Sequence, residues 1–144
     1  MNEMLERVYS RIKDTLQSLK FEVKADEENH IEIVTNTRFE EYKDDITIDI
    51  AIYDEGTFHI FFVFDQIEES LEVYRLINEF NSKSPWFSAY LSKRENDTCF
   101  LQVHGSNVGS ENDETFANLI IFYLSQIIDM HTVERLRPLS ELTH

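Results

Sequence analysis

The sequence has few of the residues that cross-link a chain or bind nucleic acid. Its one cysteine, Cys99, excludes an internal disulfide, which is typical of a reducing compartment. It has 13 Lys and Arg against 28 Asp and Glu, a formal charge of -15. This balance argues against binding to nucleic acid or to an anionic membrane, because both require clustered basic side chains. The acidity then serves solubility or attracts a basic protein partner.

Long apolar runs are also missing. The longest, Leu119 to Leu124, is far too short to span a bilayer. The stretch Asn2 to Arg7 is charged and amphipathic, unlike a secretory signal peptide. We therefore expect no membrane association and a cytoplasmic location. The 144 residues, 42% of them hydrophobic, predict one domain over residues 1–144 with a substantial core.

The most regular pattern lies in the middle of the chain. Residues 45–53 alternate isoleucine with other residues, and residues 57–64 repeat the alternation with Phe58, Ile60 and Phe62. Because side chains of a strand alternate between its faces, both segments are predicted strands, joined by a turn at Gly56. Apolar residues at helical spacing over 68–81 then predict an amphipathic helix, which ends before Pro85.

The flanking patterns complete an α+β fold. Helical spacing predicts one helix over residues 3–19 and another from a capping box at Ser110 to about His131. The tail 133–144 is broken by Pro138, and it is expected either to pack Leu136 or to fray. Predicted strands cover 30–34, 86–91 and 98–104, an extended segment begins at 21–23, and 35–44 and 105–112 are predicted loops. We predict an antiparallel sheet of about five strands packed by three helices, in the order α-β-β-β-α-β-β-α.

The second central strand is apolar on both faces, since Phe61 and Val63 point away from Ile60 and Phe62. Such a strand is covered on both sides or meets another subunit, and core or homodimer packing is favoured over a ligand groove. The expected protein-interaction surface comprises Phe61, Val63, Val73, Phe80 and Trp86.

Chemically reactive residues show no catalytic spacing. Cys99 and His104 lie five apart on one predicted strand, so they point to opposite faces and cannot form a dyad. The five histidines, at 30, 59, 104, 131 and 144, match no metal-ligand motif, and His59 could meet His104 only in a particular strand order. Gly105 to Gly109 lacks the pattern of a phosphate-binding loop.

Acidic clusters are the remaining candidates for chemistry. They lie at 26–28, 40–45 and 111–114, and none has the spacing of a calcium loop. We predict no catalytic residue, no cofactor and no metal site. A small metal-dependent hydrolase that uses these loop carboxylates is the alternative.

A resemblance to a known family emerges from residues 71–128. Leu76-Ile-Asn-Glu-Phe80-Asn81 and Trp86-Phe-Ser-Ala-Tyr90-Leu91, followed by a polar loop, a strand and a long helix, resemble the YbjN-like bacterial sensory-transduction regulator domain. The order of elements is similar to the type III secretion chaperone-like fold of that domain. The resemblance implies a non-enzymatic regulatory adaptor, often dimeric, that binds another protein. An acidic immunity or antitoxin-type protein with a basic partner is a variant of this hypothesis.

Overall fold

The computed structural model describes residues 1–94, 96, 98–109 and 112–144. Within these residues the chain forms four helices and six strands. The helices are α1 (Glu3–Ser18), α2 (Leu71–Lys83), α3 (Asp113–Ile127) and α4 (Met130–Ser140). The strands are β1 (Glu22–Glu27), β2 (His30–Thr37), β3 (Ile46–Tyr53), β4 (Thr57–Gln66), β5 (Ser88–Lys93) and β6 (Cys99–Val108).

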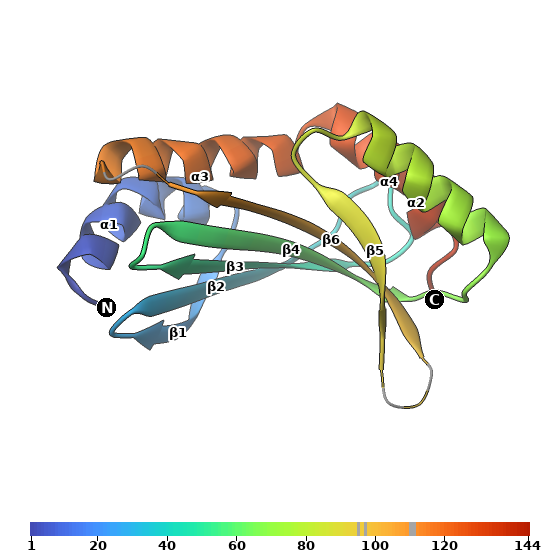
Figure 1. Ribbon diagram of the computed structural model, residues 1–144, viewed down its shortest axis with the longest axis horizontal. Helices are drawn as coiled ribbons and strands as arrows, with labels where there is room; N and C mark the ends of the chain where they lie inside the picture. The colour runs from blue at the N-terminus through green and yellow to red at the C-terminus, as the bar shows by residue number, and fades with distance from the viewer. Residues whose placement is uncertain (95, 97, 110–111) are drawn as a thin grey trace.

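The strands form one antiparallel sheet in the order β1-β2-β3-β4-β6-β5. The four helices lie along one side of this sheet, and no helix of the described chain covers its other side (Figure 1). The predicted α+β class and antiparallel pairing are therefore confirmed. The predicted counts of about five strands and three helices are each one too low.

The core lies between the sheet and the helices. Alternate side chains of β3 and β4 point into it, and Ile50, Phe58, Ile60 and Phe62 are at most 1% exposed. The helices contribute the other side, for example Val8 of α1 and Ile120 of α3, both fully buried. Removal of this apolar area from water is the main force that holds helices and sheet together.

Two predicted loop or tail segments are ordered elements instead. Residues 105–108, predicted as loop, extend β6 because they pair with the first half of β4, where Thr57 lies opposite Val108. Gly105 is required there, since a Cβ at this position would lie 2.6 Å from the Phe87 ring. The tail forms α4 despite Pro138, because its apolar face, including Leu136, is buried against the core.

The helix predicted to reach His131 ends at Ile127, and α4 follows after a short break. The capping box predicted at Ser110 lies outside the described residues. The N-cap of α3 is Asn112, whose side chain accepts hydrogen bonds from the backbone N–H groups of Glu114 and Thr115. In the described chain no single helix has the length and apolar composition to cross a membrane. Taken together, α3 and α4 meet both criteria, but the pair is bent by 53° at the break between them.

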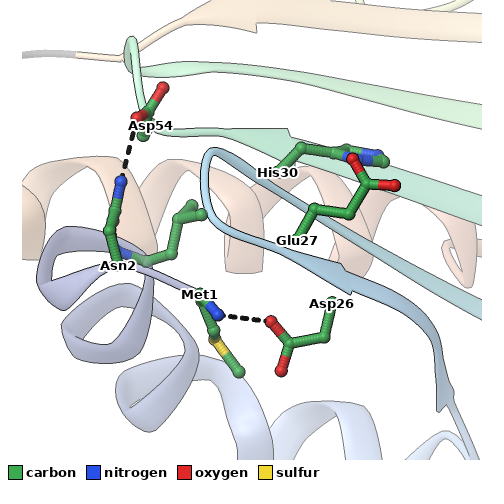
Figure 2. Close-up of polar contacts among 7 residues, drawn as sticks. Met1, Asn2, Asp26, Glu27, His30 and Asp54 are labelled. Carbon is green, nitrogen blue, oxygen red and sulfur yellow. Dashed lines mark hydrogen bonds and ion pairs between the residues drawn. The ribbon is translucent and has the colours of Figure 1, made fainter.

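The start of α1 is fastened to two turns of the sheet. Asn2 caps the helix by accepting from the Leu5 N–H, and its own N–H donates to the Glu28 carbonyl in the β1–β2 turn. Its side-chain amide also donates to Asp54 in the β3–β4 turn, at 2.9 Å, as Figure 2 shows. One residue thus fixes α1 at the end of the sheet where both hairpins turn.

Candidate functional site

The side of the sheet that none of the described helices covers is the candidate functional site. We call it the open face and define it by the half-buried or exposed side chains that alternate with the core residues of β2 to β6. Among them are His30, Glu32, Val34, Thr47, Asp49, Ala51, Tyr53, His59, Phe61, Val63, Tyr90, Phe100, Gln102 and His104. A sheet face of this composition, apolar and aromatic at its centre, is unusual when left exposed to water.

A row of aromatic and imidazole rings crosses the open face. The His30 and Tyr53 rings stack with centroids 4.9 Å apart, and Tyr53 meets the edge of His59 at 6.2 Å. His59 lies beside His104 at 5.1 Å, and His104 stacks on Phe61 at 4.6 Å. The row therefore links four strands, β2, β3, β4 and β6, through side chains alone.

The two central histidines are hydrogen-bonded to one another. His59 Nδ1 and His104 Nε2 are 2.9 Å apart, so one nitrogen donates and the other accepts. They meet because β4 pairs with β6, which brings His59 diagonally opposite His104. Burial lowers the pKa of His104 because the imidazolium would lose contact with water, and the neighbouring His59 imidazole lowers it further.

An acidic pair flanks the ring row. Burial raises the pKa of Asp49 to about 6, and the nearby Glu32 carboxyl contributes to the same shift. The pKa of Glu32 is lowered, mainly by its hydrogen bond with Asp49 and also by Lys24. The Lys24 ammonium lies 3.2 Å from Glu32 and 3.6 Å from Asp49. Below about pH 6 the pair therefore consists of a protonated Asp49 that donates to an ionised Glu32.

The structure separates the five residues of the predicted interaction surface. Phe61 and Val63 lie half-buried on the open face. Val73 and Phe80 are each 2% exposed in the core, so their inclusion in a surface is wrong. The apolar side of α2 is wide because it contacts both β5 and α4. The sequence pattern had not indicated α4 as a helix.

Trp86, the fifth residue, is exposed on the helical side of the molecule. It meets the Phe122 ring edge-on at a centroid distance of 5.0 Å, and both side chains are 38% exposed. We call these two residues the aromatic patch. Phe122 belongs to α3 and was not among the residues singled out from the sequence, because its helix presents apolar residues on nearly all sides.

Asn81, at the end of α2, protects an edge of the sheet. Its side chain accepts a hydrogen bond from the Ala89 N–H at 2.7 Å and donates one to the Ala89 carbonyl at 3.0 Å. The side-chain amide thereby imitates the backbone of a further strand next to β5. An exposed strand edge invites pairing with other chains, so Asn81 blocks that edge at Ala89.

The residues considered for catalysis are not brought together. Cys99 is buried, whereas His104 lies on the open face, as their spacing predicts. A polar cleft of about 510 Å³ near Cys99 is lined by Glu69, Lys93 and seven other residues. In the part of the chain that the structure describes, no group of three or more His, Cys, Asp or Glu side chains could hold a metal ion.

Comparison with known proteins agrees with this fold. The model of the YbjN family, described as "Putative bacterial sensory transduction regulator", matches residues 9–130. A crystal structure of YbjN, described as a putative transcription regulator from E. coli, is 15% identical, covers 91% of this chain and 87% of that chain, and has a TM-score of 0.52. That likeness shows a shared fold, and no curated protein matches the chain. The resemblance first indicated by residues 71–128 is thereby confirmed, and the chain belongs to the YbjN family.

Proposed function

We propose that the protein is a non-enzymatic regulatory adaptor of the cytoplasm that acts by binding other proteins. The observation that carries this proposal is the open face, a sheet surface with apolar and aromatic side chains at its centre and no helix over it. A family of sensory transduction regulators is consistent with such a role. An exposed sheet surface with few charges at its centre is suited to binding another protein.

The first partner is a second copy of the chain, docked face to face on the open face. Five strands spaced about 4.8 Å apart and about seven residues long give a sheet area of roughly 550 Å². Two copies would bury roughly 1,100 Å², close to the lower limit of stable interfaces. The rings of the row carry no formal charge, and the carboxylates of Asp49 and Glu32 on the same face are partly compensated by the Lys24 ammonium.

The second partner is a basic protein that binds the side away from the open face. The aromatic patch of Trp86 and Phe122 offers an apolar anchor there, and aromatic side chains are common at the centres of interfaces. The net charge of -15 attracts a basic partner over long range. Association should therefore slow several-fold from low to physiological salt, whereas self-association should strengthen because the repulsion between like charges is screened.

The oligomeric state tests the proposal directly. Sedimentation velocity of the wild type at 5–100 µM should show a species of twice 17.1 kDa, and Phe61→Asp should give the mass of one chain because it places a charge in the docked face. Phe122→Asp is the matched control, since it adds the same charge to an aromatic residue outside that face, and it should leave the dimer intact. A wild-type monomer over this range, or equal dissociation by both variants, would refute the proposed dimer.

A further inference from the structure

We infer that the His59–His104 pair makes self-association through the open face sensitive to pH, so that uptake of a proton by the pair separates the two copies. The inference rests on the proposed dimer and concerns how that contact is regulated. In the strand order of the open face β4 is central and β6 is its neighbour, and both imidazoles are half-buried there.

The geometry of the pair limits how many protons it can hold. A hydrogen bond between two neutral imidazoles joins one N–H donor to one acceptor nitrogen, and the 2.9 Å separation is of this kind. When both rings are fully protonated, each nitrogen carries a hydrogen and each ring a positive charge. The two rings would then have to move apart. Tyr53 at one side and Phe61 at the other hold them in place, so the movement would disturb the whole ring row.

Docking of a second copy opposes protonation even before the rings separate. A sheet packed on the open face removes water from the imidazoles, and a charged group that loses water without gaining a partner is strongly disfavoured. The lowered pKa of His104 shows that partial burial already acts in this direction. A group whose pKa falls further in the dimer favours the dimer above its pKa in the monomer, and this contribution is lost as the pH falls through that value.

Other titratable groups on the same face need to be separated from this effect. Asp49 on β3 has a pKa of about 6, next to Glu32 of β2 and Lys24 of β1. Proton uptake by Asp49 removes a negative charge from each copy, which reduces repulsion and favours the dimer at low pH. That effect has the opposite sign to the one proposed for the histidines, so Asp49→Asn removes it from the measurement.

The remaining neighbours contribute little positive or negative charge to the pair. On β2, His30 lies at the far end of the ring row, 3.7 Å from Glu27, with Tyr53 between it and His59. On β5, Ser88 lies opposite His104, and Tyr90 donates to Gln102 on β6. The core side of β4 and β6 presents apolar residues such as Ile60 to the helices.

The test measures the dimer dissociation constant by sedimentation velocity at pH 7.5 and pH 5.5, in EDTA, with Asp49→Asn as the parent. Each dimer holds two pairs, so uptake of one proton by each pair on dissociation weakens binding by up to about 100-fold per pH unit, and we expect at least about tenfold across this range. His104→Gln, which keeps a polar side chain of similar reach, should reduce the ratio to about threefold or less. His131→Gln, at an exposed position of α4, is the matched control and should leave the ratio unchanged.

Each result is decisive when circular dichroism shows that the variants are folded. His59→Gln also disrupts the histidine pair and replaces His104→Gln in the test if that variant does not fold. A dimer equally tight at both pH values overturns the inference and leaves the proposed dimer standing. So does a pH ratio that His104→Gln and His59→Gln both retain. A parent that is monomeric at pH 7.5 overturns the proposed dimer itself, and the inference with it.

Discussion

Substitution of Asp49 by asparagine should stabilise the protein at neutral pH. Asp49 has a pKa of about 6 in the folded state against an ordinary value of 3.8, so folding favours its protonated form. Between these two values the folded state binds more protons than the unfolded state, and stability falls as the pH rises. Above pH 6 Asp49 is therefore a carboxylate in a place that disfavours its charge. Asparagine removes the charge, and its amide can donate to Glu32 as the protonated carboxyl does.

The magnitude follows from the shift and from the exposure of the site. A difference of about two pKa units corresponds to roughly 3 kcal/mol. The Asp49 side chain is still 21% exposed, and water screens much of this penalty, so we expect a gain of about 1 kcal/mol in the free energy of unfolding at pH 7.5. The lost contact with Lys24 offsets little of it, because that ammonium is 55% exposed and keeps its partner Glu32.

Urea denaturation at pH 7.5 and pH 5.0 checks this expectation. At pH 5.0 the wild-type Asp49 is largely protonated in the folded state, so the gain should shrink to about half of its value at pH 7.5. Asp14→Asn, at an exposed position of α1, is the matched control and should change stability little at either pH. A less stable Asp49→Asn at pH 7.5, or a gain of the same size at both pH values, would refute the reasoning.

Two further substitutions test the edge cap and the cysteine. Asn81→Ala should lower the free energy of unfolding by about 1–2 kcal/mol and increase aggregation seen by light scattering, because Ala89 loses both partners at the sheet edge, whereas Asn78→Ala on the same helix should do neither. Cys99→Ala should cost about 1 kcal/mol and leave the oligomeric state unchanged, since the thiol is a small buried side chain. A folded Cys99→Ala that no longer self-associates would show that the thiol has a functional role.

The parts of the fold that follow a strict pattern could be predicted from the sequence. The alternation in β3 and β4 and the apolar stripe of α1 coincide with the buried positions, because each element buries one face only. The edge strand β1 lacks this signal, since five of its six residues are exposed. The glycines after His104 indicated a loop, but pairing with β4 overrides this local preference and extends β6.

The candidate site depended on contacts that no local pattern contains. His59 and His104 meet only because β6 rather than β5 lies next to β4, and this strand order cannot be read from the pattern of either strand. Phe61 and Val63 could be assigned to the face opposite the core from alternation alone. Val73 and Phe80 could not be placed, because their burial depends partly on α4, whose pattern is interrupted by Pro138.

The strand order also has a consequence for the rate of folding. Strands β1 to β4 are joined by successive hairpins, so each can form after closure of a short loop. The pairing of β4 with β6 joins positions as distant as Thr57 and Val108, with α2 and β5 in between. Long-range pairing is slow because much chain entropy is lost before it is rewarded. We expect the first four strands to assemble early and to present β4 as the template on which the C-terminal half completes the sheet.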